Sequence, residues 1–293
     1  LKKNNLCIKK KKIKSSEKKI NEVSNYLTNA KYPVLLLGGG ARGCDEYILK
    51  IVEKLSPYVI TTINARGILG DHSMCIPASP TLKTVRKELK KADIVLAVGT
   101  EFGETDYDMY KDGNFPKLKK LIRVDINKTQ LTKNIQPHLS IRSDAIHFFK
   151  KLSEILLVKK HYKKSSLQTP QTAKIIRKLC LKEIEPKFKV PLNLISTISS
   201  NFPDAILVGD STQPTYAGNL YTKTSKQGKW FNSATGYGTL GYAPPASIGA
   251  KLAKPNKPVI CIVGDGGLQF SLSELMTASE EKIAVIFLIW NNF

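Results

Sequence analysis

The stretch Val259-Ile260-Cys261-Ile262-Val263-Gly264-Asp265-Gly266-Gly267 is the part of the sequence that decides the fold. Its apolar run ends in glycines, which is typical of a strand buried on both faces of a parallel sheet. A second apolar run, Ile283 to Trp290, follows and ends in Asn291-Asn292. Two parallel strands joined by a crossover place their carboxyl ends side by side. We therefore expect Asp265 and Asn292 to converge at one edge of a sheet.

The residue types at this edge favour a magnesium–diphosphate site. An Asp carboxylate and an Asn carbonyl are oxygen ligands of the kind that Mg²⁺ takes, often together with phosphate oxygens and water. The glycines allow the backbone to approach a phosphate closely. The alternative is a tight strand-to-helix turn and an unrelated Asn-Asn turn. Either half of the pattern alone would favour that alternative, but the combination favours Asp265 and Asn292 as metal ligands, beside Gly264, Gly266 and Gly267.

Alternating helical and apolar segments along the rest of the chain predict an α/β fold with parallel sheets. We predict a basic disordered arm at 1–16, a first domain at 17–158, a polar linker at 159–172 and a second domain at 173–293. The predicted helices are Glu17–Asn29, Asp45–Leu55, Thr81–Lys91, Thr172–Lys182 and Leu272–Glu281, with Ser271 or Ser273 as a possible cap of the last. The other predicted strands are Pro33–Leu37, Tyr58–Ile63, Asp93–Gly99, Leu121–Ile126 and Ala205–Asp210.

Gly264-Asp265-Gly266 followed by Asn291-Asn292 resembles the cofactor signature of the thiamine-diphosphate enzymes of the acetolactate synthase and pyruvate decarboxylase superfamily. The resemblance implies that Asp265 and Asn292 are the side-chain ligands of Mg²⁺. It also implies two three-layer α/β domains, a central domain and a domain that binds the cofactor diphosphate. The family's third ligand is a backbone carbonyl two residues after the second Asn, so we expect the cofactor domain to be truncated.

Two further stretches carry the same resemblance. Gly236–Ala243 is similar to the family segment that holds the aminopyrimidine, where Leu240 would wedge between the two rings and the Gly238 carbonyl would orient the amino group. The alternative is a glycine-rich turn before a helix that starts near Pro245, and Ala243-Pro244-Pro245 departs from the family, which usually has leucine before the proline.

The second of these stretches, Gly209–Pro214, is similar to a segment that contacts the diphosphate, which makes Thr212 and Gln213 candidates for those contacts. Asp210 has a second interpretation as a helix cap.

The sequence from Val208 to Asn292 is most similar, within the superfamily, to the 5-guanidino-2-oxopentanoate (2-ketoarginine) decarboxylases. We therefore expect a magnesium-dependent 2-keto-acid decarboxylase, with an acetolactate synthase-like enzyme or a non-catalytic, partner-binding remnant as alternatives. In the family a catalytic glutamate comes from another domain, usually of another subunit. The residues before Lys31 are too few to form that domain, so we expect an oligomer with a chain that carries it.

In the first domain, Gly38-Gly39-Gly40-Ala41-Arg42-Gly43 fits the dinucleotide pattern GxGxxG. A dinucleotide site also needs an acidic residue at the end of the next strand, and Asn64-Ala65-Arg66-Gly67 supplies none. The resemblance instead implies the family's central domain, which holds FAD in acetolactate synthases and often nothing in decarboxylases. FAD is therefore possible, and no residue of the sequence supports it.

Charge, apolar runs and cysteine spacing argue against a nucleic-acid-binding, membrane-spanning or secreted protein. The net charge is +22, but lysines are spread along the whole chain and no nucleic-acid motif accompanies them, so we expect no nucleic-acid partner. Apolar runs are too short to span a bilayer, and scattered cysteines favour a reducing compartment; we expect a cytoplasmic protein. The cluster Glu101, Glu104, Asp106 and Asp108 could bind a cation, although a solvated loop is favoured slightly. The histidines, which lack metal-ligand spacing, are His72, His138, His147 and His161.

Overall fold

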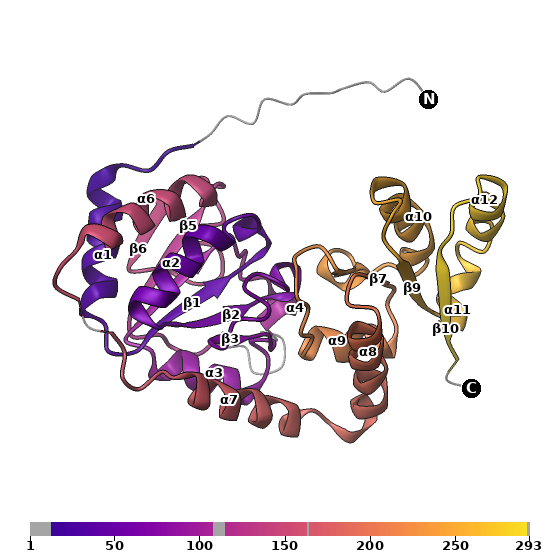
Figure 1. Ribbon diagram of the computed structural model, residues 1–293, viewed down its shortest axis with the longest axis horizontal. Helices are drawn as coiled ribbons and strands as arrows, with labels where there is room; N and C mark the ends of the chain where they lie inside the picture. Colours follow the sequence, from indigo (N-terminus) through magenta and orange to yellow (C-terminus); the bar gives the residue numbers. More distant parts are fainter. Residues whose placement is uncertain (1–12, 108–114, 163, 292–293) are drawn as a thin grey trace.

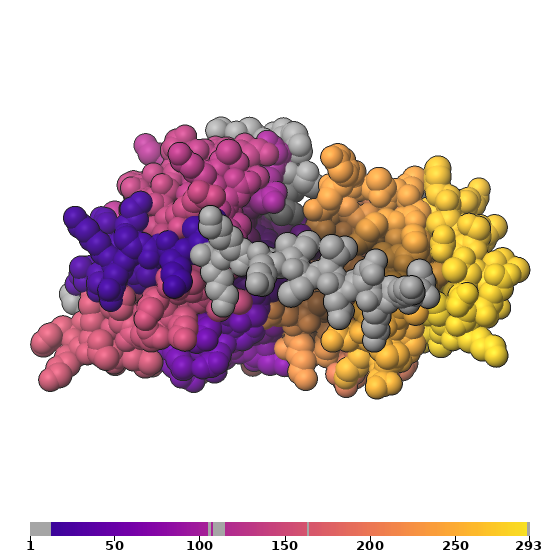
Figure 2. Space-filling view, turned by 90° about the horizontal axis from the view of Figure 1, so that it is seen from above, coloured from indigo at the N-terminus to yellow at the C-terminus, as the bar shows by residue number. Residues whose placement is uncertain are grey.

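The computed structural model describes residues 13–107, 115–162 and 164–291, apart from the side chains of residues 105 and 106. It contains two parallel β-sheets that lie in separate lobes, the N-terminal lobe in indigo and magenta and the C-terminal lobe in orange and yellow (Figure 1). The space-filling view shows the same two lobes end to end (Figure 2). The α/β class with two parallel-sheet domains is confirmed.

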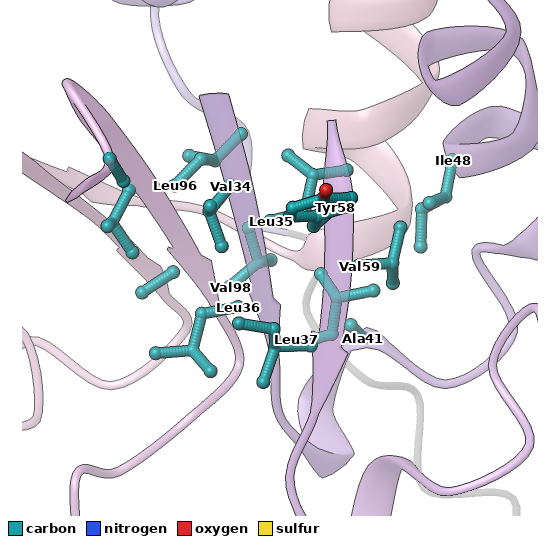
Figure 3. Packing of buried hydrophobic residues seen from close by; sticks show 14 of the residues in the cluster. Val34, Leu35, Leu36, Leu37, Ala41, Ile48, Tyr58, Val59, Leu96 and Val98 are labelled. Atoms are coloured by element: carbon teal, nitrogen blue, oxygen red, sulfur yellow. The ribbon is translucent and has the colours of Figure 1, made fainter. Parts of the chain in front are cut away.

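The first sheet has six parallel strands in the order β3-β2-β1-β4-β5-β6. Its central strand β1 is apolar and buried along its whole length, and its side chains belong to one cluster with those of β2 and β4 (Figure 3). Helices cover both faces of the sheet. Helices α1, α2 and α6 pack on one face and α3 and α7 on the other. The strands are β1 (Pro33–Leu37), β2 (Tyr58–Thr61), β3 (Cys75–Ile76), β4 (Ile94–Val98), β5 (Leu121–Asp125) and β6 (Leu139–Arg142). The helices are α1 (Glu17–Asn29), α2 (Asp45–Leu55), α3 (Lys83–Lys91), α4 (Glu104–Tyr107), α6 (Ala145–Val158) and α7 (Pro170–Glu183).

The second sheet has four parallel strands in the order β10-β9-β7-β8. Helix α8 packs its apolar residues on one face, and α10, α11 and α12 cover the other. The strands are β7 (Ile206–Gly209), β8 (Trp230–Asn232), β9 (Val259–Gly264) and β10 (Ile286–Trp290). The helices are α8 (Lys189–Asn201), α9 (Gln213–Leu220), α10 (Ala243–Ala253), α11 (Asp265–Gln269) and α12 (Glu274–Glu280). Short 3-10 turns are η1 (Gly39–Ala41), η2 (Ile63–Ala65), η3 (Pro186–Phe188) and η4 (Ser233–Thr235).

One strand differs from its prediction. The run from Ile283 to Trp290 was predicted as a buried strand, but β10 is the edge of the sheet, with Ile286 55% and Ile289 50% exposed. An apolar run has the same pattern on a central and on an edge strand, because the position of a strand in its sheet is set by tertiary pairing. The prediction of a buried strand is wrong for β10, and its pairing with β9 is as expected.

The predicted linker packs against the first lobe. The Ser165 hydroxyl donates to the Lys31 carbonyl at 2.8 Å, and the Gln168 amide donates to the Pro33 carbonyl at 2.9 Å. Helix α7 begins at Pro170, inside the predicted linker, and its buried residues join the core of the first sheet. At the other end, the Ile13 carbonyl accepts a hydrogen bond from the Asp144 N–H at 2.8 Å, so Ile13, within the predicted arm, contacts the first lobe. The domain limits themselves stay a prediction.

Among the described helices, none combines the length and the apolar character that crossing a bilayer requires.

Candidate cofactor site

Those predicted cofactor residues that the structure describes lie along the carboxyl edge of the second sheet. In the strand register, Gly209 is paired with Asn232 on β8 and with Ile262 on β9, and Trp290 of β10 is paired with Gly264. The segments that follow β7, β8, β9 and β10 therefore start at the same edge. In an open α/β sheet this edge is where ligands bind.

Asp265 lies at this edge as the first residue of α11, and its side chain is exposed. Strand β9 ends at Gly264, so Gly266 and Gly267 belong to the helix. A Cβ added at Gly267 would lie 3.1 Å from Asp210 Oδ1, whereas one added at Gly266 would meet nothing within 4 Å. Close packing against Asp210 thus favours glycine at position 267, whereas Gly266 borders open space that a ligand could fill.

The second predicted magnesium ligand, Asn292, lies outside the described residues, so the metal pair stays a prediction. Within residues 13–107, 115–162 and 164–291, no group of three or more His, Cys, Asp or Glu side chains could hold a metal ion. The expected ligand set has a single carboxylate, that of Asp265, together with amide, carbonyl and phosphate oxygens. The donors present at this edge fit such a set, with Asp265 in an accessible position.

Asp210 acts as a helix cap, but for a helix distant in sequence. Its buried carboxylate accepts from the Ser211 N–H at 2.8 Å, from the Gly241 N–H at 3.3 Å and from the Ala243 N–H at 2.8 Å. Ala243 is the first residue of α10, so Asp210 satisfies N-terminal donors of that helix. The carboxylate therefore fixes the end of the loop that contains Leu240.

The loop Gly236–Gly241, here called the pyrimidine loop, is held by two serines that the sequence reasoning did not single out. The Ser211 hydroxyl donates to the Gly238 carbonyl at 2.8 Å and lies 2.9 Å from the Ser233 hydroxyl. The N–H groups of Gly236 and Gly238 both donate to the Ser233 carbonyl, at 3.0 and 3.1 Å. The Gly238 carbonyl, predicted to orient the cofactor, is thus fixed by its own contacts.

Leu240 projects from this loop with 48% of its surface exposed. It lies between two residues with left-handed backbone conformations, Gly238 (φ 70°) and Gly241 (φ 77°). A Cβ at Gly241 would lie 2.8 Å from the Phe270 Cβ, so only glycine fits there. Pro244, which departs from the family pattern, is in the first turn of α10, where no intrahelical donor is lost.

Thr212 and Gln213 lie at the N-terminus of α9. Thr212 is in the N-cap position without a side-chain cap bond, and a Cβ at Gly264 would lie 3.4 Å from its hydroxyl oxygen. The Gln213 side-chain carbonyl accepts from the Trp290 indole N–H at 3.2 Å, which ties α9 to β10. Free backbone N–H groups and the dipole at a helix N-terminus favour an anion, so this end is suited to a diphosphate.

Comparisons with known proteins agree with this geometry. Residues 210–293 match the family model described as "Thiamine pyrophosphate enzyme, C-terminal TPP binding domain", and residues 20–152 match "Thiamine pyrophosphate enzyme, central domain". The chain belongs to the thiamine pyrophosphate enzyme family. Thiamine pyrophosphate is thiamine diphosphate under another name. The first lobe is accordingly the central domain, and the second contains the thiamine pyrophosphate-binding domain.

The relatives include enzymes of two kinds. A "Probable 2-ketoarginine decarboxylase" of Pseudomonas aeruginosa is 34% identical over 274 residues, which are 91% of this chain and 47% of that protein. An "Acetolactate synthase large subunit" of Buchnera aphidicola subsp. Acyrthosiphon pisum is 31% identical over 284 residues, 93% of this chain and 48% of the relative. The "Acetolactate synthase isozyme 1 large subunit" of Escherichia coli K12 is 29% identical over 288 residues, which are 94% of this chain and 49% of that protein. The chain thus spans about half the length of these relatives.

A cavity of about 710 Å³ lies at the carboxyl edge of the first sheet, where the strand order reverses between β1 and β4. The glycines of the GxGxxG pattern line it for a packing reason. A Cβ at Gly38 would lie 2.1 Å from the Gly99 carbonyl oxygen, and one at Gly40 would lie 2.8 Å from the Gly99 Cα. The close approach of these two loops is enough to require glycine, so the glycines are no evidence for a bound dinucleotide.

The charged wall of this cavity contains part of the predicted acidic cluster. Glu101 and Glu104 line it together with Asp144 and Arg42. The Asp106 side chain and Asp108 lie outside the described residues. The three carboxylates and one guanidinium of the described lining give the wall an acidic balance, which disfavours the diphosphate of a flavin dinucleotide.

Two histidines and four cysteines have structural roles. The His72 and His138 Nδ1 atoms accept backbone N–H groups at 3.2 and 3.1 Å. Burial lowers the pKa of His72, and His161 is exposed. Burial raises the pKa of four cysteine thiols to about 12, which keeps them protonated and unreactive. These are the buried, unpaired Cys44, Cys75, Cys180 and Cys261.

Proposed function

We propose that this chain forms the diphosphate and magnesium half of a thiamine diphosphate site in a 2-keto-acid decarboxylase. The observation that carries the proposal is the convergence of Thr212, Gly264 and Asp265 at one sheet edge, inside the segment that matches the cofactor-binding domain. Two relatives, a decarboxylase and a synthase, support a reaction at a 2-keto acid.

Each residue has a role in this proposal. The N-terminus of α9, with Thr212 and Gln213, and the backbone at Gly264–Gly267 would bind the diphosphate. Asp265 would hold Mg²⁺ together with Asn292. The Gly238 carbonyl and Leu240 would fix the pyrimidine ring and the folded shape of the cofactor. When bound, thiamine diphosphate supplies the nucleophilic carbon and the electron sink for carbon–carbon cleavage.

A decarboxylase is favoured over a flavin-containing synthase by the cavity of the central domain. Among the residues that the structure describes, its wall carries Glu101, Glu104 and Asp144 against Arg42, so a flavin diphosphate would meet net negative charge there. The absorbance spectrum of the purified chain decides between the two, since bound flavin would favour the synthase. The catalytic glutamate would come from a further domain, which we expect to reach the site through an oligomer.

The direct test is calorimetric titration of thiamine diphosphate into the chain, first with Mg²⁺ and then with EDTA. We expect binding that requires Mg²⁺ and that is lost in Asp265→Ala. Loss of an outer-shell partner of a metal typically costs about 10- to 100-fold in affinity, so loss of a direct ligand is expected to cost at least as much. The matched control is Glu280→Gln, which removes an exposed carboxylate at the end of α12 in the same lobe.

The same titration also tests the alternative of a non-catalytic or partner-binding subunit. No binding by a wild-type chain that unfolds cooperatively would contradict a working cofactor half-site. A non-catalytic or partner-binding subunit would then be the better interpretation. Equal weakening in Asp265→Ala and Glu280→Gln would contradict the specific role of Asp265 while leaving cofactor binding in place.

A further inference from the structure

Arg66, a residue of the central domain, reaches into the cofactor-binding lobe. It follows η2 and is 1% exposed. Its Nη1 donates to the Thr61 carbonyl and hydroxyl oxygens at 2.7 and 3.1 Å, and its Nη2 donates to the Asn219 carbonyl at 3.1 Å. Burying a charge is costly unless it is well bonded, so these contacts impose a defined position on the backbone of Asn219.

Asn219 lies in the last turn of α9, whose first turn faces the proposed diphosphate site. The last carbonyls of a helix lack intrahelical donors and carry partial negative charge. Arg66 supplies both a donor and a positive charge at that end. A diphosphate at Thr212 and Gln213 would supply the negative charge that suits the other end. Arg66 of the central domain and the proposed diphosphate would thus contact opposite ends of α9.

The side chain of Asn219 forms a reciprocal amide pair with Asn232. The Trp230 indole N–H can only donate, and its 3.1 Å bond therefore identifies the Asn219 oxygen. Asn232 Nδ2 donates to that oxygen at 2.8 Å, and Asn219 Nδ2 donates to Asn232 Oδ1 at 3.2 Å. Asn232 Oδ1 also accepts the Ala234 N–H at 3.1 Å. All three side chains are buried, so no water competes for these bonds.

The chain of contacts continues to the pyrimidine loop. Asn232 is followed directly by Ser233, whose carbonyl accepts the N–H groups of Gly236 and Gly238. The Ser233 hydroxyl meets Ser211, which donates to the Gly238 carbonyl. Every step from the Arg66 guanidinium to this carbonyl is therefore a hydrogen bond within 3.5 Å or a peptide linkage.

We propose that Arg66 and Asn219 are positioning residues for the cofactor, which act through the Asn219–Asn232 pair on the pyrimidine loop. The proposal rests on the proposed function. It predicts that Arg66 of the central domain affects the affinity for the cofactor without contacting the cofactor. It also gives a physical reason for Asn219, Trp230 and Asn232, which the cofactor contacts alone leave unexplained.

The experiment measures two quantities in the full chain with Arg66→Lys or Asn219→Ser. Thiamine diphosphate affinity in the presence of Mg²⁺ is expected to fall by about 5- to 150-fold, the range of a typical coupling between sites. Hydrogen exchange at the Gly236 and Gly238 amides is expected to become faster. The matched control is Arg123→Lys. Arg123 is also 1% exposed, and the hydrogen bonds that the structure describes for it end on the Lys133, Ile135, Thr100 and Glu101 carbonyls, all in the first lobe.

The outcomes separate this proposal from the proposed function. Faster exchange at Gly236 and Gly238 in both variants, but not in Arg123→Lys, would support the coupling of Arg66 and Asn219 to the pyrimidine loop, whereas absence of cofactor binding by the wild-type chain would overturn the proposed function and with it the role in cofactor positioning. Unchanged exchange and unchanged affinity in a cofactor-binding wild type would overturn it and leave the proposed function intact. If Arg66→Lys fails to fold, Asn219→Ser alone decides, because it leaves the buried charge and its backbone contacts in place.

Discussion

The Asp210 carboxylate accepts the Ala243 N–H at 2.8 Å, which joins the end of β7 to the start of α10 across 33 positions of sequence. This single side chain receives three backbone donors and is fully buried. It therefore fixes the pyrimidine loop from one end, while Ser211 and Ser233 fix it from the other.

Replacing Asp210 by Ala is expected to destabilise the chain. Three backbone donors lose their acceptor in a buried position, which should lower the free energy of unfolding by about 1–3 kcal/mol. Urea unfolding followed by circular dichroism measures the change. Asp204→Ala is the control, because that exposed residue only forms surface ion pairs with Lys229 and Lys257, and little change is expected. Equal stability of Asp210→Ala and wild type would contradict the capping role.

Gly266→Ala should separate cofactor binding from stability. A Cβ there meets nothing within 4 Å and lies in helix α11, so the free energy of unfolding should be unchanged or slightly higher. The added methyl would occupy the space where phosphate oxygens are expected, and thiamine diphosphate affinity should fall. Calorimetry with Mg²⁺ and urea unfolding on the same sample test this. Unchanged affinity would place the diphosphate elsewhere along the edge.

Gly241→Ala should lower the free energy of unfolding. The residue has φ 77°, and a Cβ would lie 2.8 Å from the Phe270 Cβ. Strain of this kind costs about 1–3 kcal/mol, so the urea midpoint should fall clearly below that of Gly266→Ala. A wild-type midpoint for Gly241→Ala would show that the loop relaxes without cost.

His72 should contribute a pH dependence to stability. Burial lowers its pKa in the folded state below the usual 6.5, and its neutral Nδ1 accepts the Met74 N–H; Glu53 opposes the shift weakly. The unfolded state therefore binds the proton more tightly, so this stability is present above the unfolded pKa and is lost as pH falls below it. Urea midpoints at about pH 7.5 and about pH 5.5 should differ less in His72→Gln than in wild type or in the exposed control His161→Gln.

The four buried cysteines should resist a thiol reagent in the folded chain. Burial raises the pKa of each thiol to about 12, so almost no thiolate forms near neutral pH. A variant with Cys7→Ser reports on these four alone, and its reaction should follow unfolding as urea is increased. Rapid reaction without denaturant would contradict the packing of Cys44, Cys75, Cys180 and Cys261.

Much of the fold could be predicted because its central strands are long and apolar. Strand β1 and helices α1 and α2 were predicted with the bounds that the structure has. Strand β8, with three residues, was missed because so short a segment carries no readable periodicity.

The candidate site was predictable only in part for a similar reason. Asp265 and Gly264 follow a clear strand, so their place at the sheet edge could be inferred from topology. The partners of Asp210, Arg66 and Asn219 are distant in sequence, and nothing local indicates them. Ser211 directly precedes Thr212, which was predicted as a site residue. Its own role could not be predicted, because it depends on a hydrogen bond to Gly238, 27 positions later.

The two tryptophans give the chain two built-in fluorescent reporters in chemically different settings. Trp230 is 2% exposed and hydrogen-bonded within the buried amide network, so its emission should be blue-shifted and should follow the contact between the lobes. Trp290 is partly exposed and bonded to Gln213 beside the proposed diphosphate position, so its emission should respond to whatever occupies that end of α9. Replacing either tryptophan by phenylalanine leaves a single emitter, so the occupancy of the sheet edge and the coupling between lobes can be followed optically without any attached label.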